Sequence, residues 1–526
     1  MTTLTVKGED IMIKADIVLK SSKIFTSVSN TIINGFVAIA GEKIIATGSL
    51  KEAELYIGEN TKVLELGDKV ICPGFVDVHC FFTGYVLGFV GADLTKAESA
   101  EEILILLRKH AANLYKEKPI LGHGLDSEKI DISDSSLLDN VFGSEPVVLF
   151  AKGGETCWMN TAAKKKYKFT PDTCYPEAYW RLLKEVLNDK SFIVPQFKNY
   201  ISMLNSRGIT AVKEMGFDDF YGFTEILQEL ERNKELTLRV SFMSQPVGEG
   251  ANLAFGRKMR EELKGNFLEF SGYNRMTDGS ISCLCGDLKK PYNCADTHCA
   301  QEIDYKMIEE ETLAADAENF RFSLHAQGDA AIAKVIDIFD KCKKDNGKLI
   351  NRHAITDIEF SDPGDLERMG RLGVIAEIYP QIMSIANAKD KLSMINEKIG
   401  MERGKYYWNR RKMADSGVTL SCGTDLPLLI PDIPESIYHA CGGLFPEGGE
   451  PFNKDNTLTI EEVLTAWTKG GQYNLYHENI LGTLEAGKLA DIAVLDRDIF
   501  NTDIETIRDV KVCLTIVNGR IVYCSI

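Results

Sequence analysis

Histidine, carboxylate and a few other polar side chains stand where apolar runs of this chain come to an end. At or near these ends lie His79, Glu214, Asn274, Asp278, His325, Asp357, Tyr379 and Asp425. Imidazole and carboxylate groups that converge in space can hold a divalent metal or act as an acid–base pair. Any one of them can equally cap a helix or line a loop, so the argument rests on the whole set.

The runs that precede these residues predict strands. They are Gly74–His79, Ile209–Glu214, Leu238–Phe242, Phe270–Thr277, Phe322–His325, Ala354–Glu359, Val374–Ile378 and Val418–Gly423. Helical segments separate most of them, and Ser99-x-x-Glu102 and Thr459-x-x-Glu462 fit capping boxes at helix starts. Eight strands alternating with helices predict an α/β fold, a (β/α)8 TIM-like barrel, whose functional residues lie at the carboxyl ends of the strands.

Both ends of the chain are rich in predicted strands. These are Ala15–Leu19, Gly35–Ile39 and Lys43–Ala46 near the start, and Ala490–Leu495, Val510–Val517 and Arg520–Tyr523 near the end. The dipeptide Asn518-Gly519 is a strong signal for a hairpin turn. We therefore expect a small β-sandwich domain built from both termini.

The predicted division of the chain is 1–70 and 476–526 for the sandwich and 71–475 for the barrel. An inserted subdomain at about 85–195 is too long for one connection and holds its own helix near Glu101–Lys116 and a strand at Val147–Phe150. It is in a position to cover the barrel mouth.

Composition narrows the class of protein. The chain has 526 residues and a formal net charge of -17, which argues against a nucleic-acid groove or an anionic membrane surface. We find no apolar run near the roughly 18 residues of a membrane span and no signal peptide. Thirteen cysteines, many inside apolar runs, indicate reduced thiols, so the expected location is cytoplasmic.

Several motifs resemble one known family. The run from Cys72 to His79 reads CPGFVDVH, and the run from Leu481 to Ile492 reads LGTLEAGKLADI. Between them come Asp278-Gly279-Ser280, HAQGD ending at Asp329, and GTDLP beginning at Gly423. In this order the motifs resemble the amidohydrolase superfamily, in its amidohydrolase-3 or YtcJ-like branch, which includes N-substituted formamide deformylases. The resemblance extends from about Ala15 to Tyr523.

That resemblance implies a metal centre. Relatives hold one or two divalent ions with a first-strand His-x-His pair, a fourth-strand lysine, histidines on the fifth and sixth strands and an eighth-strand Asp. The metal acidifies a bound water and polarises the scissile carbonyl, and the Asp moves the proton. By this resemblance His79, His325 and Asp425 match a first-strand ligand, the fifth-strand ligand and the catalytic carboxylate.

Three other positions depart from the family pattern. Phe81 replaces the second first-strand His, Asn274 replaces the lysine, and Asp357 replaces the sixth-strand His. A binuclear centre is therefore not expected. The set His79, His325, Asp425 and Asp357 is consistent with one divalent metal (Zn, Mn or Fe) or with none.

Two further residues, Glu155 and Cys80, are relevant to the chemistry of the site. The segment that starts at Gly153 resembles one in which the family has His at the place of Glu155, so Glu155 joins Asp425, His325 and Asp357 as a catalytic candidate. Cys80 is expected to point away from His79, because neighbouring residues of a strand face opposite sides.

The leading interpretation is a hydrolase that cleaves a carbon–nitrogen bond, in a non-peptide or cyclic amide, of a small molecule. One alternative is a metal-independent acid–base enzyme (hydrolase, isomerase or lyase) on the same barrel. The other is a catalytically silent small-molecule-binding protein. The expected partner is a small-molecule substrate, with no nucleic acid and no membrane, and the family resemblance makes a homodimer plausible.

Overall fold

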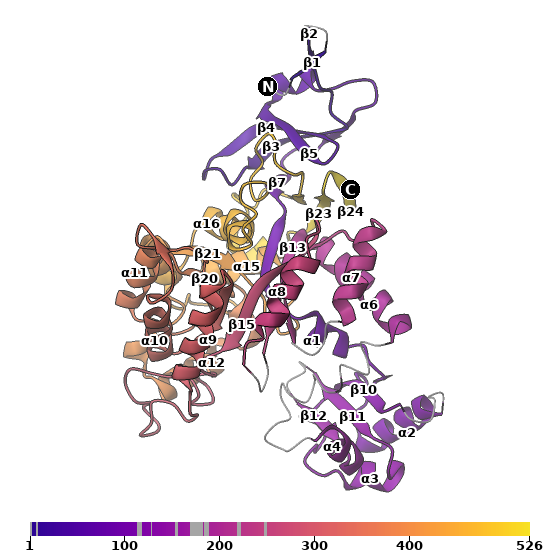
Figure 1. Cartoon of the computed structure of the whole chain (residues 1–526), viewed down its shortest axis with the longest axis vertical. Helices are drawn as coiled ribbons and strands as arrows, with labels where there is room; N and C mark the ends of the chain where they lie inside the picture. Colours follow the sequence, from indigo (N-terminus) through magenta and orange to yellow (C-terminus); the bar gives the residue numbers. More distant parts are fainter. Residues whose placement is uncertain are drawn as a thin grey trace.

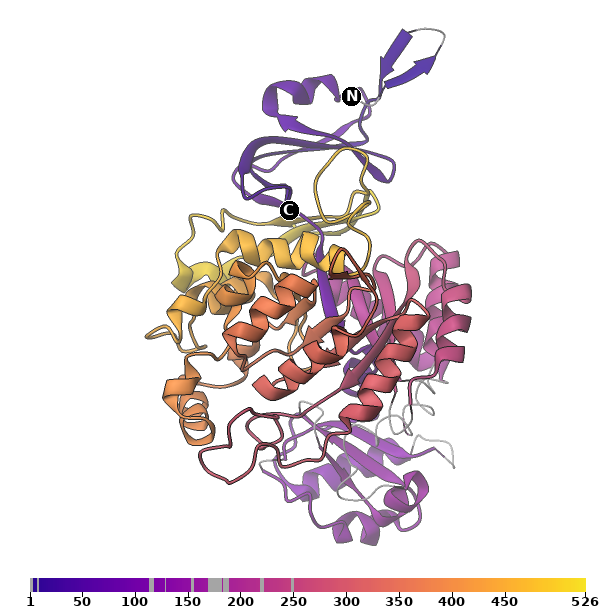
Figure 2. The same ribbon diagram turned by 60° about the vertical axis from the view of Figure 1, so that its left-hand side comes forward.

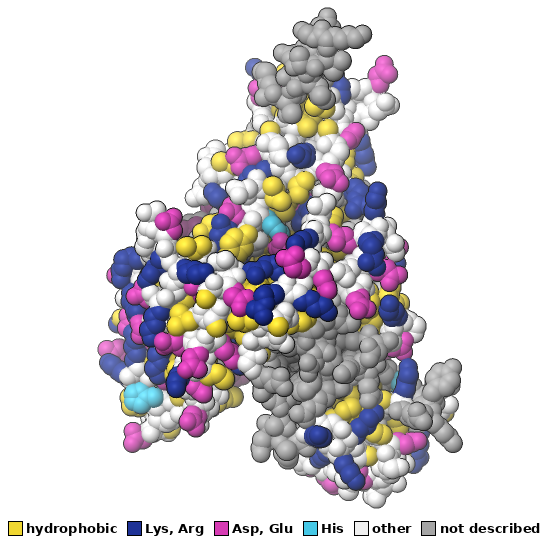
Figure 3. All heavy atoms as spheres, viewed as in Figure 1, with side chains coloured by type: hydrophobic (Ala, Val, Ile, Leu, Met, Phe, Trp, Pro, Cys, Tyr) yellow, Lys and Arg dark blue, Asp and Glu magenta, His cyan; other side chains and the backbone are white. Residues whose placement is uncertain are grey.

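The computed structural model describes residues 3–6, 9–112, 118–127, 129–152, 156–168, 182, 189–217, 222–246 and 250–526. A strand-rich part built from both termini lies at one end of the long axis, and a smaller α/β part lies at the other (Figure 1). The barrel lies between them. No helix within the described ranges is long and apolar enough to cross a membrane. On the face drawn in Figure 3, acidic and basic side chains are intermixed.

The two termini build one strand-rich domain together, as predicted, and its eight strands form one branched sheet. They are β3 (Ile17–Phe25), β4 (Ile32–Ala40), β5 (Lys43–Ser49), β6 (Lys62–Glu65), β7 (Val70–Pro73), β22 (Ile492–Leu495), β23 (Val512–Val517) and β24 (Arg520–Cys524). β3 pairs with β6 along its first half and with β7 further on, so the sheet branches there. Asn518 and Gly519 both have positive φ, of 51° and 75°, which gives the tight turn between β23 and β24 that their sequence predicts. A hairpin of β1 (Thr3–Val6) and β2 (Glu9–Met12) projects from this end (Figure 2).

All eight predicted barrel strands are present and run parallel. They are β8 (Phe75–Cys80), β13 (Ile209–Phe217), β14 (Arg239–Gln245), β15 (Leu268–Met276), β16 (Arg321–His325), β19 (Ala354–Thr356), β20 (Ile375–Ile378) and β21 (Thr419–Cys422). A bridge from Cys80 to Leu426 joins the first strand to the chain after the last one. The buried carboxylate of Asp77 supports this seam, because it accepts hydrogen bonds from the hydroxyl (2.5 Å) and the backbone N–H (3.2 Å) of Thr424.

Helices lie between and after these strands. They are α1 (Phe82–Leu87), α6 (Lys190–Asn205), α7 (Gly222–Arg232), α8 (Leu253–Glu262), α9 (Tyr305–Ala317), α10 (Asp329–Phe339), α11 (Pro363–Leu372), α12 (Ala388–Lys398), α13 (Met401–Gly404), α14 (Arg410–Asp415), α15 (Ile433–Gly442), α16 (Ile460–Thr465) and α17 (Gly471–Asn474). The capping box predicted at Thr459 and Glu462 is present at α16. At Ser99 one of the two hydrogen bonds of the capping box forms, from the Glu102 N–H to the Ser99 hydroxyl. The Glu102 carboxylate accepts from the Glu98 N–H instead of the Ser99 N–H.

The segment after the first barrel strand folds into a sheet of its own. Strands β9 (Ala92–Asp93), β10 (Ile120–Leu125), β11 (Val147–Ala151) and β12 (Cys157–Met159) form it, with α2 (Ala100–Ala111), α3 (Ser136–Phe142) and α4 (Thr161–Tyr167). A separate apolar cluster that includes Trp158 and Ile103 holds these elements together. This part lies at the end of the molecule opposite the terminal sheet (Figure 1). β8 runs away from the terminal sheet, so the inserted part is on the side of the strands' carboxyl ends.

One buried ion pair joins the terminal sheet to the barrel. The Asp491 carboxylate accepts hydrogen bonds from Arg239 Nε (2.8 Å) and Nη2 (3.0 Å), and from the Asn518 N–H (2.8 Å). The Asp491 carbonyl accepts from the Gly74 N–H just before β8. This explains the aspartate in the C-terminal motif: its side chain and backbone anchor the first and third barrel strands to the sheet.

Breaking this pair from one side will destabilise the protein. Arg239→Ala leaves a buried carboxylate without its cation and should lower the free energy of unfolding by about 3–5 kcal/mol. Chemical denaturation followed by circular dichroism measures it. Lys306→Ala, which removes a largely exposed pair with Glu310, should cost less than about 1 kcal/mol. Equal losses for the two variants would contradict this view of the junction.

Candidate active site

The four candidate metal ligands lie at the carboxyl ends of their strands and form two pairs. His79, on β8, faces Asp425 with 3.7 Å between Nε2 and Oδ1. His325, at the end of β16, lies 3.1 Å from Asp357, measured from Nε2 to Oδ2. Asp357 and Asp425 both have positive φ, of 58° and 53°. This sparsely populated backbone region is often found at functional sites.

Carboxylates face His79 on both sides. Its Nδ1 lies 3.4 Å from Thr356 Oγ1 and 3.8 Å from Glu377 Oε2, and its Nε2 faces Asp425. The rings of Phe81 and Tyr379 lie 5.4 Å and 5.6 Å away. The carboxylate of Glu377 is fully buried behind the His79 imidazole. A carboxylate in this position can fix the orientation of the imidazole and stabilise its protonated form.

Glu377 is the centre of a polar network inside the barrel. Its Oε1 is close to Lys213 Nζ and accepts hydrogen bonds from Ser323 (3.1 Å) and Asn474 (3.0 Å), and Arg321 lies 3.5 Å away. Burial alone would raise the pKa of Glu377. The charges of Lys213 and Arg321 and the proximity of His79 outweigh burial and hold this pKa well below its usual range. Glu377 is therefore a permanent anion below His79.

Strand alternation explains which side chains reach this interior. On β16, Arg321, Ser323 and His325 occupy alternate positions, contacting Asn474, Glu377 and Asp357 in turn. The three inward-facing residues thus step from the amino end of the barrel to its mouth. On β13 the inward residue is Lys213.

Glu214, the next residue, faces outward. Its carboxylate accepts from the Phe82 N–H (2.5 Å) and the Tyr200 hydroxyl (3.2 Å), and Cys80 Sγ lies 3.5 Å away. Burial raises the pKa of Glu214 to about 8. Cys80 therefore points away from His79, as predicted, and Glu214 fastens α1 and α6 to the barrel from outside the mouth.

His325 is held between two carboxylates. Its Nδ1 lies 3.6 Å from Asp278 and its Nε2 3.1 Å from Asp357. Backbone N–H groups of Asp287, Gln327 and Gly328, each at 2.9 Å, fix the Asp278 carboxylate. Burial would lower the pKa of His325, but the nearby Asp278 and Asp357 carboxylates raise it to about 10. Both nitrogens of His325 are therefore directed at carboxylates, which favour its protonated form.

These residues do not fit a metal centre. A catalytic zinc site needs about three protein ligands with free lone pairs. His325 lies between Asp278 and Asp357, so within the family's ligand set His79 and Asp425 face each other as a separate pair. Over the described ranges, the one group that brings three donor atoms within 4.8 Å of one another is Asp316, Cys342 and His353, on the amino side of β19. In this group, Nδ1 of His353 accepts a hydrogen bond from the Phe322 N–H, and its Nε2 is hydrogen-bonded to Asp316. Both nitrogens of His353 therefore have a partner already.

Other side chains occupy the two remaining ligand positions of the family pattern. Phe81 packs beside His79 at the start of α1. Asn274 donates to Gln245 across neighbouring strands, at 2.9 Å. Gly423 shows how tight the mouth is, because a Cβ there would lie 2.8 Å from His79 Cβ. Glu155, the fourth catalytic candidate, lies outside the described residues.

The sequence interpretation missed Lys213 and Glu377. A signal for them was present, since each is a charged residue inside an otherwise apolar strand, in ITAVKEM and VIAEI. A charge in such a place must be paired when it is buried. The role of Asp278 in holding His325 was also not anticipated, although its motif was recognised.

Comparison with known proteins identifies the family. Residues 62–523 match the Amidohydrolase family, Amidohydro_3. The chain belongs to this family. Protein LONG AFTER FAR-RED 3 of Arabidopsis thaliana is 22% identical over 97% of this chain and 92% of its own length. N-substituted formamide deformylase of Arthrobacter pascens is 21% identical over 93% of this chain and 94% of the enzyme.

A solved structure has the same fold. The crystal structure of an uncharacterized metal-dependent hydrolase from Pyrococcus horikoshii OT3 matches with a TM-score of 0.73 at 21% identity, covering 93% of this chain and 99% of that one. The predicted barrel of an amidohydrolase is therefore confirmed, as is the branch of the family.

The charge state of His325 can be measured directly. Nitrogen NMR of protein labelled at histidine should show an imidazolium at about pH 8 that disappears in His325→Gln. Its contribution to stability is complete below pH 6.5 and is lost as the pH rises through about 10, because folding raises the pKa. His353, whose pKa burial lowers, provides a neutral reference signal. A neutral His325 at pH 8 would contradict the two-carboxylate assignment.

Proposed function

We propose that this amidohydrolase cleaves a carbon–nitrogen bond, in a non-peptide or cyclic amide, of a small molecule with water activated by His79. The observation that carries the proposal is the alignment of Glu377, His79 and Asp425, which runs from the barrel interior to its mouth. The relative from Arthrobacter pascens, by its name a deformylase of N-substituted formamides, supports the type of bond.

The proposed reaction uses side chains of this chain alone. His79 Nε2 takes a proton from a water molecule, whose oxygen forms a bond to the amide carbon. Glu377 stabilises the resulting imidazolium through Nδ1. The imidazolium then gives its proton to the leaving nitrogen as the carbon–nitrogen bond breaks, so the products are a carboxylic acid and an amine.

Charge at the mouth favours this step. Asp425 faces the same nitrogen, with a third of its side chain exposed, and can orient the water and stabilise the charged His79. Such preorganised charges are commonly the largest contribution to catalysis.

Aromatic residues lead from His79 to the surface and favour a substrate with an apolar substituent. Phe81 is the N-cap residue of α1, Tyr85 lies within the helix, and Phe89 follows its C-cap. The rings of Tyr85 and Phe89 lie 4.9 Å apart, and Phe89 is 44% exposed. Further exposed apolar side chains lie at or beyond the carboxyl ends of other barrel strands, namely Met276, Ile385, Leu428 and Ile430.

Substitution of the proposed base tests the function. With a panel of N-formyl, N-acetyl and cyclic amides bearing apolar or charged substituents, amine release should be fastest for apolar ones. His79→Gln and Asp425→Asn should each lower kcat by about 10²–10⁴ with little change in KM. His110→Gln, on α2, serves as the matched control.

Two results would overturn the proposal. Full activity in His79→Gln would exclude this base. Saturable binding of panel members by the wild-type protein, without turnover of any of them, would establish the silent binding protein that the sequence also allowed.

Metal analysis separates this mechanism from that of metal-dependent relatives. After expression with added zinc, manganese and iron, the purified protein should hold far less than one equivalent, and chelators should leave its activity unchanged. The reason is that, among the described residues, no three His, Cys or carboxylate donor atoms converge at the mouth. One equivalent of metal that is lost in His79→Gln, together with chelator-sensitive activity, would show that a metal binds in the mouth.

A further inference from the structure

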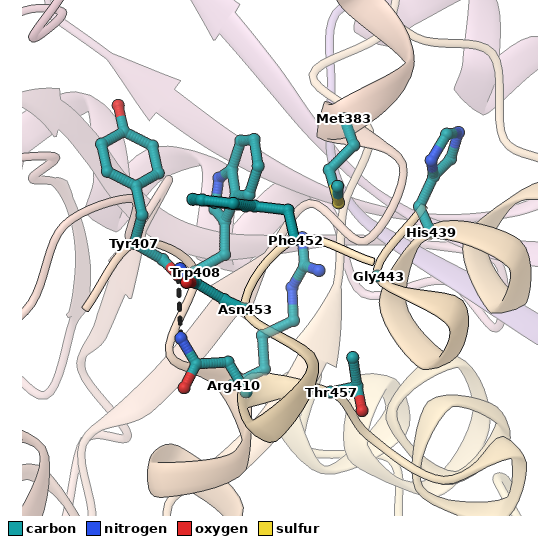
Figure 4. Close-up of a pocket in the computed structure, with 10 residues that line it drawn as sticks. Met383, Tyr407, Trp408, Arg410, His439, Gly443, Phe452, Asn453 and Thr457 are labelled. Atoms are coloured by element: carbon teal, nitrogen blue, oxygen red, sulfur yellow. Dashed lines mark hydrogen bonds between the residues drawn. The ribbon is translucent and has the colours of Figure 1, made fainter. Parts of the chain in front are cut away.

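A small cavity lies beside the barrel, between segments that follow the seventh and eighth strands. Its volume is about 10 Å³, close to the space needed for one water-sized occupant. It is lined by Met383, Tyr407, Trp408, Arg410, His439, Gly443, Phe452, Asn453, Asn456 and Thr457. In Figure 4 the Arg410 side chain extends from α14 toward the level of Phe452, with Met383 and His439 beyond its guanidinium group.

Arg410 is buried without a counter-charge. It is 5% exposed, and its side chain makes one hydrogen bond within the described part of the chain, from Nη2 to the Tyr379 carbonyl, at 3.1 Å. No carboxylate of the described residues pairs with it, and burial lowers its pKa to about 10. A guanidinium carries five N–H donors, so most of its hydrogen-bonding capacity is unused. A buried cation in this state is costly unless an anion accompanies it.

Trp408 brings a second unused donor. Its indole Nε1 is buried and has no hydrogen-bond partner among the described residues, although the side chain lines the cavity. The backbone of Trp408 is in the left-handed region, with φ of 47°, and its N–H bonds the Glu359 carbonyl at 2.6 Å. The fold therefore keeps this bulky side chain beside Arg410 in a conformation that has an energetic cost.

Other polar groups that line the cavity already make hydrogen bonds. His439 contacts the Leu444 carbonyl through Nδ1 and Glu435 through Nε2. The amide N–H groups of Asn453 and Asn456 donate to backbone carbonyls, among them that of Tyr407. Glu359, a carboxylate whose charge acts on Arg410, is engaged by Lys391 and by the Tyr407 hydroxyl. The unused N–H donors of Arg410 and Trp408 are groups that can hold an anion.

We propose that this cavity binds one small monovalent anion, of the size and chemistry of chloride, between the Arg410 guanidinium and the Trp408 indole N–H. The anion neutralises the buried arginine. Met383 and Phe452 give the site apolar walls, which favour a weakly hydrated ion over a larger, strongly hydrated one such as sulfate.

Occupancy would reach the active site through a short path. Arg410 holds the Tyr379 carbonyl, and the Tyr379 hydroxyl lies 3.0 Å from Thr356 Oγ1. The Thr356 hydroxyl oxygen in turn lies 3.4 Å from His79 Nδ1. The anion therefore acts as a structural support for the residues behind His79 and is not a substrate.

Thermal unfolding of the full chain at constant ionic strength tests the site. Replacing gluconate with chloride or bromide should raise Tm by about 1–2 °C and saturate, whereas sulfate should not. Arg410→Met should remove the chloride effect. Arg371→Met, an exposed arginine on α11, should retain it.

A second measurement does not depend on a stable variant. Crystals of the wild-type protein soaked in bromide should give an anomalous peak in the cavity. Equal Tm in all the sodium salts together with no bromide peak would overturn the proposal and show that water fills the space. A bromide peak without any saturable shift in Tm would show an adventitious ion only, and would equally overturn it.

Discussion

A fully buried ion pair between Glu377 and Lys213 lies across the barrel interior, and the arrangement of the mouth depends on it. Two buried charges are tolerated there because Ser323, Asn474 and Arg321 complete their hydrogen bonds and charge balance. The pair connects β13 to β20 across the barrel. Its carboxylate also faces His79, so one interaction holds opposite strands together and positions the proposed base.

Positive charges supplied by the protein balance the acidic groups at the mouth and beneath it. Lys213 and Arg321 face Glu377, and His325 faces Asp278 and Asp357. In a metal-dependent relative, part of this charge belongs to the ion. Here Glu377 has Lys213 and Arg321 as partners, Asp278 has three backbone N–H groups, and Asp357 has His325.

Much of the fold was predictable from sequence, for a physical reason. Strands that are buried on both faces read as short apolar runs, and all eight barrel runs appear in the structure. The hairpin at Asn518-Gly519 followed from two residues that tolerate positive φ. The candidate site was less predictable. Strand ends identified His79, His325, Asp357 and Asp425 as neighbours, but not how they pair.

Pairing depends on side-chain distances that a sequence does not contain. The two-carboxylate arrangement of His325 arises because Asp278, far away in sequence, is turned toward it by three backbone N–H groups. Lys213 and Glu377 meet only because β13 and β20 lie across the barrel from each other. Periodicity shows that a residue faces inward, whereas its partner is decided by closure of the barrel.

Each of the three departures from the family's ligand pattern has contacts of its own. Asp357, where the family pattern has histidine, places a carboxylate 3.1 Å from His325. Phe81 packs against His79, and Asn274 is held by Gln245. Restoring any one ligand would leave the others engaged elsewhere. The mouth is thus a consistent arrangement of its own, in which each former ligand position has acquired a new partner.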